Sequence, residues 1–224
     1  MKTIPTLGDI LQAQGVSRRG FMKYCAATAS LLALPPAMVP RIAQALEQAR
    51  RPSVIWLSFQ ECTGCTDSLT RSSSPTLEGL IFDSISHDYH HTLQAASGDA
   101  AEAARHAAMK ENMGQYLVLV DGSIPMGNPG FSTIAGISNY DMLMETVEGA
   151  AAVVAIGSCA AFGGIPGANP NPTGAVSVQD LVKDKPVVNV PGCPPIPMVI
   201  TAVLAQFLTF GQLPELDIHG RPMA

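Results

Sequence analysis

The sequence predicts an α/β fold, an open parallel sheet with helices on both faces. Short runs of apolar, largely β-branched residues recur along the chain, helix-like stretches lie between them, and glycine or small polar residues end most runs. Such alternation requires crossover connections, which make neighbouring strands parallel. The composition, 47% hydrophobic and 14% charged, is that of a packed globular protein.

Four segments have the short, continuous apolar pattern of strands buried on both faces. In chain order these strands are expected at Ser53–Phe59, Tyr116–Asp121, Ala151–Ile156 and Pro186–Val190.

The segments between and after the strands have helical character. The helices are expected at Thr76–Ile85, Ala100–Asn112, Met142–Gly149, Val178–Asp184 and Met198–Phe210. A Gly-, Pro- and Asn-rich stretch over 163–175 is expected to form a long loop. Loops at the carboxyl ends of strands build the ligand site in open α/β sheets.

Residues 1–45 are predicted to be an export signal that is not part of the fold. Arg18 and Arg19 precede a large apolar residue, a lysine and a mildly apolar stretch, a pattern that resembles a twin-arginine signal. Two prolines interrupt that stretch, whereas a membrane anchor needs about 20 apolar residues. Ala43-Gln44-Ala45 fits a cleavage site, so the mature chain is expected to begin near Leu46, unless the signal stays attached.

Without this signal the chain is acidic. The signal holds five of the 13 basic residues and one of the 18 acidic ones, so the remainder has 8 Lys and Arg against 17 Asp and Glu, a formal net charge of −9. An acidic domain without a basic cluster is a poor nucleic-acid binder. No second long apolar segment is evident, so the remainder is not expected to span a membrane.

Four cysteines are predicted to meet at one edge of the sheet. Cys62 and Cys65 follow the first strand, Cys159 follows the third and Cys193 follows the fourth, whereas Cys25 lies in the signal. Because the strands are parallel, their carboxyl ends share an edge. We therefore expect the four thiols to converge.

Converging thiols leave three kinds of site open: a disulfide, a zinc site and an iron-sulfur cluster. Twin-arginine export suits a protein loaded with a cofactor before export, which favours a metal centre over a disulfide. Structural zinc sites usually pair two local knuckles, but here only one pair is local. Gly64, Gly157 and Gly192 let backbone amides approach the sulfurs closely, and the pattern favours a four-iron cluster.

Five motifs, in this order, resemble the small subunit of nickel-iron hydrogenases over essentially the whole chain. They are Cys62-Thr63-Gly64-Cys65, Asp121-Gly122-Ser123-Ile124-Pro125, the run from Gly157 to Gly164, Asn171-Pro172-Thr173-Gly174-Ala175 and Pro191-Gly192-Cys193-Pro194-Pro195. The resemblance implies a flavodoxin-like domain over 46–210. It also implies that Cys62, Cys65, Cys159 and Cys193 bind a proximal [4Fe-4S] cluster.

The same resemblance implies a function and partners. The chain would be the electron-transfer subunit of a periplasmic [NiFe] uptake hydrogenase, and the catalytic metals would lie on a separate large subunit, so no catalytic residue is expected here. The twin-arginine export machinery and a cytochrome b or other membrane electron acceptor are further expected partners; the chain would be membrane-associated through them. A zinc-stabilised structural or binding module, or a thiol-disulfide oxidoreductase using Cys62 and Cys65, remain the alternatives.

Two carboxylates and two histidines near these motifs require separate interpretation. Glu61 precedes the first thiol and is equally compatible with an interface or proton-path role and with a solvated turn. Asp121 could face the cluster, although a turn-forming Asp before glycine is the favoured interpretation. His90 and His91 are assigned to a helix-like polar stretch, in packing or solvent, and not to a metal.

The family's oxygen-tolerant branch has two further thiols where this chain has Gly64 and Gly164, so a standard four-thiolate cluster is expected. The family continues into a region that binds medial [3Fe-4S] and distal [4Fe-4S] clusters. Residues 211–224 are expected to start that region, so neither cluster is expected on this chain, and His219 is not assigned as a ligand. An incomplete chain is preferred to a natural short form, because the tail shows no cap or closing strand.

Overall fold

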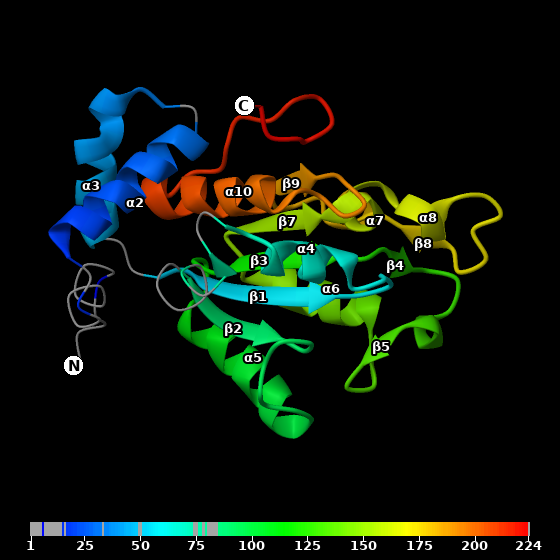
Figure 1. Cartoon of the computed structure of the whole chain (residues 1–224). Coiled ribbons are helices and arrows are strands. Elements are labelled where there is room, and N and C mark those ends of the chain that lie inside the picture. The colour runs from blue at the N-terminus through cyan, green and yellow to red at the C-terminus, as the bar shows by residue number, and fades with distance from the viewer. Residues whose placement is uncertain are drawn as a thin grey trace.

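The computed structural model contains a five-stranded parallel sheet in the order β2-β1-β3-β7-β9 (Figure 1). The structure describes residues 6, 15, 17–32, 34–48, 51–73, 76, 77, 79 and 85–223. The strands of the sheet are β1 (Ser53–Ser58), β2 (Ser86–His90), β3 (Leu117–Asp121), β7 (Ala152–Ile156) and β9 (Val187–Val190). The predicted fold class and its four apolar strands are confirmed, with ends that differ by one residue.

Strand β2 corrects the assignment of His90 to a helix-like stretch. His90 ends this edge strand, and its side chain is fully buried, whereas His91 follows the strand and is exposed. The pairing with β1 is irregular: Val54 pairs with His87, but the next residue, Ile55, pairs with Tyr89. The strand shows little sequence signal because it is polar and interrupted, with only its last two residues buried.

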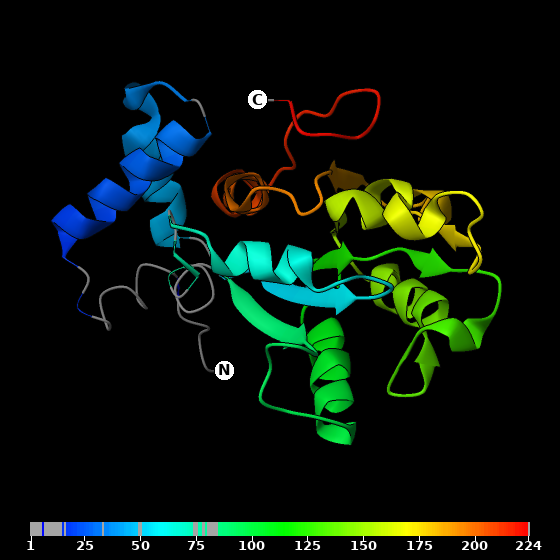
Figure 2. The same ribbon diagram turned by 45° about the vertical axis from the view of Figure 1, so that its right-hand side comes forward.

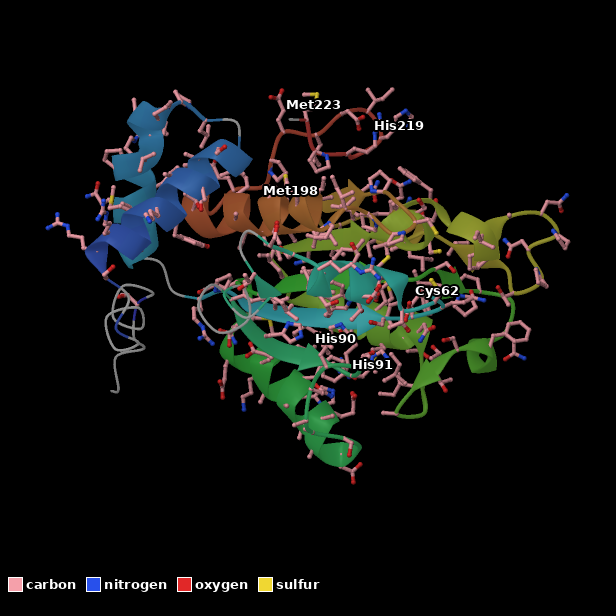
Figure 3. The ribbon with its side chains drawn as sticks, viewed as in Figure 1. Cys62, His90, His91, Met198, His219 and Met223 are labelled. Atoms are coloured by element: carbon pink, nitrogen blue, oxygen red, sulfur yellow. The ribbon has the colours of Figure 1, made fainter. Side chains whose placement is uncertain are left out.

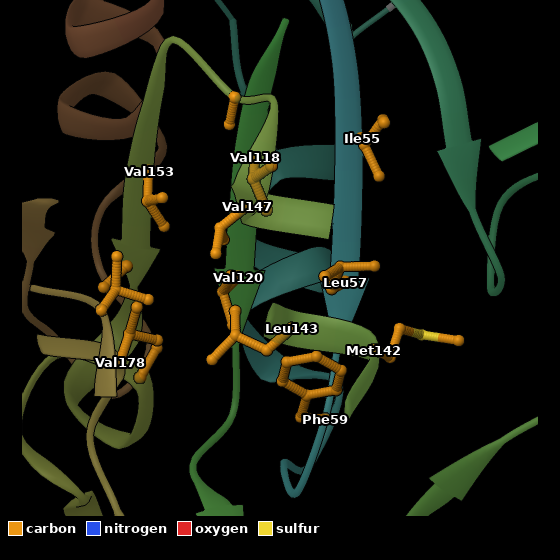
Figure 4. Close-up of a cluster of buried hydrophobic side chains, with 14 of the residues drawn as sticks. Ile55, Leu57, Phe59, Val118, Val120, Met142, Leu143, Val147, Val153 and Val178 are labelled. Carbon is orange, nitrogen blue, oxygen red and sulfur yellow. The ribbon is translucent and has the colours of Figure 1, made fainter. Parts of the chain in front are cut away.

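Helices cover both faces of the sheet, as predicted. On one face, α5 (Asp99–Glu111) and α6 (Asn139–Glu148) pack on alternate residues of the strands, and Figure 4 shows Met142, Leu143 and Val147 of α6 in this core. On the other face lie α4 (Gly64–Thr70) and α10 (Pro197–Phe210). Figure 2 shows α10 and α5 on opposite sides of the sheet. Burial on both faces explains why the strands are apolar throughout.

The predicted helices are present where the chain is described. Three correspond to α5, α6 and α10, and the one expected at Val178–Asp184 is shorter, as α9 (Val178–Leu181). Most of the helix expected over 76–85 lies outside the described residues. The short helices α4, α7 (Gly157–Phe162) and α8 (Gly164–Gly167) were not expected, and α8 lies inside the predicted loop. The remaining elements are η1 (Pro36–Met38), β4 (Ile124–Pro125), η3 (Pro129–Phe131), β5 (Thr133–Ile134), β6 (Ile137–Ser138) and β8 (Ala175–Val176).

The described part of the predicted export signal forms helices that pack on the domain. Helix α2 (Arg18–Leu31) is capped by the Ser17 hydroxyl, and α3 (Val39–Gln48) contains the predicted cleavage sequence. Phe21, Cys25 and Ile42 form a small core against Phe210 at the end of α10. The export role itself stays a prediction. None of the described helices is both long and apolar enough to cross a bilayer.

Residues 215–223 form a C-terminal hook that is fastened to the edge of the sheet. The Asp217 carboxylate accepts backbone N–H bonds from His219 and Arg221. The hook reaches β9 through the Asn189 N–H, which donates to the Gly220 carbonyl over 2.7 Å. A bridge between Leu216 and Pro222 closes it. The described residues contain no strand after α10, as expected, and this bridge and these hydrogen bonds fasten the tail instead.

Candidate functional site

The four predicted thiols lie in turns that leave the same edge of the sheet. Cys62 and Cys65 stand between β1 and α4, Cys159 lies in α7 directly after β7, and Cys193 follows β9. These three strands run parallel, so the turns share the edge formed by their carboxyl ends, which we call the thiol edge. Figure 3 shows Cys62 at this edge and His219 on the hook, away from it.

Direct contacts join the three turns. The Ser158 N–H donates to the Gly192 carbonyl over 2.8 Å, which ties the turn after β7 to the turn after β9. The Ser68 hydroxyl of α4 donates to the Pro195 carbonyl over 2.5 Å, which ties α4 to the same turn. A methyl group built on Gly157 would lie 2.4 Å from the Cys65 sulfur, so the turn after β7 also contacts the first thiol pair.

The electrostatics of the thiols agree with this proximity. Burial, together with the negative charges of Asp121, Cys159, Glu61 and Cys62, raises the pKa of Cys65 to about 12. Burial also raises the pKa of Cys159, with a further contribution from Cys193. The thiols therefore repel one another when ionised, and a bound cationic centre would remove this penalty. Cys62, Cys65, Cys159 and Cys193 are all free thiols.

Three glycines form a cradle around the sulfurs. The first is Gly157, described above, whose φ is +86°. A methyl group on Gly164 would lie 2.6 Å from the Cys159 sulfur, and one on Gly64 would lie 3.3 Å from the Cys62 sulfur. These positions keep backbone close to the sulfurs and leave room at the thiol edge. Cys62 and Cys193 are exposed, so one side of this group faces outward. The thiolate donor set and the glycine cradle fit an iron-sulfur cluster.

Among the described residues, no three or more His, Cys, Asp or Glu side chains are grouped so that they could hold a single metal ion. A cluster of several irons keeps its ligand sulfurs farther apart than one tetrahedral ion does.

The other two quoted motifs support the first thiol pair. The Gln60 side-chain amide donates to the Thr173 hydroxyl over 3.1 Å, and the Ser123 hydroxyl donates to the side-chain oxygen Oε1 of Gln60 over 3.2 Å. Backbone bonds between Gln60 and Ser123 run in both directions. Ser123 of the second motif and Thr173 of the fourth therefore hold Gln60 in place, two residues before Cys62.

Glu61 lies beside the thiols, half-buried. Burial, together with the charge of Asp121, raises the pKa of its carboxyl to about 7. The Thr63 hydroxyl donates to one of its oxygens over 3.3 Å, and the other oxygen is buried without a partner among the described residues. This environment differs from the solvated turn considered above, and an interface or proton-path role stays a prediction.

Asp121 is fully buried and does not act as a turn-forming side chain. The Trp56 indole donates to one carboxylate oxygen over 3.0 Å, and the Thr66 hydroxyl approaches the other at 3.4 Å. His90 extends this network, because its Nε2 lies 3.2 Å from the Thr66 hydroxyl. Burial raises the pKa of Asp121, and these hydrogen bonds oppose the rise. The sequence interpretation missed this network because its members are distant in the chain.

Several large apolar side chains that follow the strands of the sheet in sequence are exposed. They are Met126, Phe131, Phe162, Ile165 and Ile196, with Ile165 at 78% exposure. Exposed apolar residues that gather in one region are typical of a protein-protein contact.

Comparisons with known proteins identify similar chains. The family model described as NADH ubiquinone oxidoreductase, 20 Kd subunit, matches residues 62–207. The chain is 45% identical to the uptake hydrogenase small subunit of Azotobacter vinelandii, over 99% of this chain and 62% of that protein. It is 44% identical to the hydrogenase-2 small chain of Escherichia coli strain K12, over 95% of this chain and 58% of that protein. The chain thus spans about three fifths of the length of these curated relatives.

Solved structures show the same similarity. The fold matches the Ni-Fe-Se hydrogenase of Desulfomicrobium baculatum with a TM-score of 0.73 and 32% identity, over 77% of this chain and 70% of that one. It matches the [NiFeSe] hydrogenase of Desulfovibrio vulgaris Hildenborough with a TM-score of 0.71 and 34% identity, over 77% and 69%.

Proposed function

The chain belongs to the nickel-iron hydrogenase small-subunit family, and we propose that it is the electron-transfer subunit of a periplasmic uptake hydrogenase. Members of this family carry iron-sulfur clusters and pair with a large subunit. The proposal assigns one proximal [4Fe-4S] cluster to Cys62, Cys65, Cys159 and Cys193. The observation that supports it most directly is the interlocking of three strand-end turns, which gathers four free thiols at one edge.

The cluster would accept and release single electrons during oxidation of dihydrogen on the large subunit. The chain's own contribution is to hold the four sulfurs and to keep backbone close to them at Gly157 and Gly164. The exposed apolar side chains support pairing with the large subunit. Export by the twin-arginine machinery, a periplasmic location and a cytochrome b or similar membrane acceptor belong to the same proposal.

A thiol-disulfide oxidoreductase is disfavoured by the environment of Cys65. Reactive cysteines of such enzymes have a lowered thiol pKa. At Cys65, burial and four neighbouring negative charges raise the pKa to about 12 instead.

Serine substitutions test the ligand set. We expect Cys159→Ser and Cys193→Ser each to remove the brown colour and most of the iron from the full chain purified without oxygen, because each removes one cluster ligand. The matched control is Cys25→Ser, since Cys25 lies in the small core of α2 and α3, and this variant should keep its iron. Full visible absorption in both ligand variants would contradict the assignment.

The glycines at positions 64 and 164 predict a cluster with ordinary redox chemistry. A side chain at Gly164 would also lie 2.7 Å from the Cys159 Cα, so the backbone there is fitted to glycine. We expect electron paramagnetic resonance during oxidative titration to show a single oxidation step of the cluster. A second one-electron oxidation at mild potential would refute this expectation.

A further inference from the structure

A buried polar network lies directly behind the first thiol pair. Asp121 ends the central strand β3, and its carboxylate has no exposed surface. The Trp56 indole on β1 donates to it over 3.0 Å, and Thr66, the residue that follows Cys65 in α4, approaches it at 3.4 Å. The carboxylate is therefore linked to Cys65 through the next residue in the chain, Thr66.

The hydrogen bonds of His90 define the direction of this network. The Thr92 backbone N–H donates to Nδ1 of His90 over 3.2 Å, so the ring proton resides on Nε2. That proton is directed at the Thr66 hydroxyl, 3.2 Å away, and leaves the hydroxyl proton free for Asp121. Both carboxylate oxygens of Asp121 then act as acceptors, which is the arrangement that an ionised carboxylate takes.

The charge of Asp121 is uncompensated and extends to the thiol edge. Among the described residues, none of the ion pairs involves Asp121. Its carboxylate lies 3.4 Å from the hydroxyl of Thr66, which directly follows Cys65 in the chain, so the charge lies close behind the thiol edge. A fixed negative charge in a site with little water acts more strongly than one at the surface.

We propose that the Asp121 carboxylate, held in place by Trp56 and by Thr66 with His90, lowers the reduction potential of the cluster. The inference rests on the proposed function, because it requires the cluster. In the step concerned, one electron enters the oxidised cluster from the hydrogen-oxidising partner, and no bond of this chain forms or breaks. The electron adds negative charge beside an existing negative charge, so the carboxylate disfavours the reduced form. Asp121 is thus a positioning residue for electron flow and not a catalytic one.

Replacement of the charge tests the proposal. We expect Asp121→Asn to raise the midpoint potential of the cluster, followed by electron paramagnetic resonance, by about 59 mV, a tenfold change in the ratio of reduced to oxidised cluster. The matched control is Asp67→Asn, which removes the same charge two residues after Cys65. The Asp67 side chain is 58% exposed and paired with Arg71, so water screens it and the potential should not change.

A second variant, Trp56→Phe, tests the proposal if the Asp121→Asn protein does not bind the cluster. Trp56→Phe keeps an aromatic ring beside His90, 5.1 Å away by ring centroids, but removes the 3.0 Å hydrogen bond. Because this hydrogen bond favours the ionised carboxylate, the titration is run at a pH high enough to keep Asp121 ionised. The carboxylate charge is then less compensated, and we expect the potential to fall, opposite to the effect of Asp121→Asn. An unchanged potential in a loaded Asp121→Asn protein, or in Trp56→Phe if the former does not load, would overturn the proposal while the proposed function stands. A wild-type chain without iron would overturn the proposed function instead.

Discussion

Gly157→Ala is expected to abolish cluster binding although it removes no ligand. The added methyl group would lie 2.4 Å from the Cys65 sulfur and must displace it, and the backbone at this position has a φ of +86°. Cluster assembly needs all four sulfurs at fixed positions, so we expect iron in the anaerobically purified chain to fall from about four per chain to less than one. Iron analysis and visible absorption measure this loss.

Gly136→Ala is the matched control for this variant. Gly136 also has a positive φ, +78°, but a methyl group there meets no atom within 4 Å. The backbone strain, about 1 kcal/mol, is shared by both variants, whereas the contact with the sulfur is not. An equal loss of iron in the two variants would show that backbone strain, and not the position of Cys65, governs loading, and full iron in Gly157→Ala would contradict the prediction.

Arg105→Met is expected to cause the largest loss of stability. The Arg105 side chain is fully buried between α5 and α6, with bonds to the Glu102 carboxylate at 3.0 Å and the Glu145 carboxylate at 2.7 Å. It also donates to the Thr146 hydroxyl over 2.8 Å. Removal of Arg105 leaves Glu102 buried beside an apolar side chain, because the Glu102 side chain is only 14% exposed. We expect the free energy of unfolding to fall by about 3 kcal/mol, the low end for a broken buried pair, since Glu145 is partly exposed.

The same substitution at an exposed ion pair is the matched control, because it removes an arginine charge that is not buried. Arg71 pairs with Asp67 over 3.1 Å, but both side chains are more than half exposed, so Arg71→Met should cost less than about 1 kcal/mol. Urea unfolding of both variants, without oxygen, compares the two free energies. An Arg105→Met protein as stable as Arg71→Met would show that the buried network does not hold α5 to α6.

The apolar strands could be predicted because their signal is local, and the meeting of the thiols could be predicted from the parallel direction of those strands. Strands β1, β3 and β7 are buried on both faces, and this produces continuous apolar runs. Strand β2 could not be predicted in this way, because an edge strand carrying His87 and Asp88 lacks such a run. The helices α4 and α7 are too short for a periodic pattern, and both begin at glycine.

The buried network around Asp121 could not be predicted because its partners are far apart in the chain. Trp56 is 65 residues and Thr66 is 55 residues from Asp121, and only the parallel order of β2, β1 and β3 brings His90 beside them. The hook is similar: Asn189 holds it 30 residues away through the His219 carbonyl. Such contacts follow from strand order, which the sequence pattern did not determine.

The direct test of the account is the content of iron, zinc and acid-labile sulfide in the full chain purified without oxygen. If the turns after β1, β7 and β9 bring four thiolates around one cluster, the chain will contain about four irons and four sulfides and no stoichiometric zinc. One zinc per chain without sulfide, or a metal-free chain with a disulfide between Cys62 and Cys65, would contradict it.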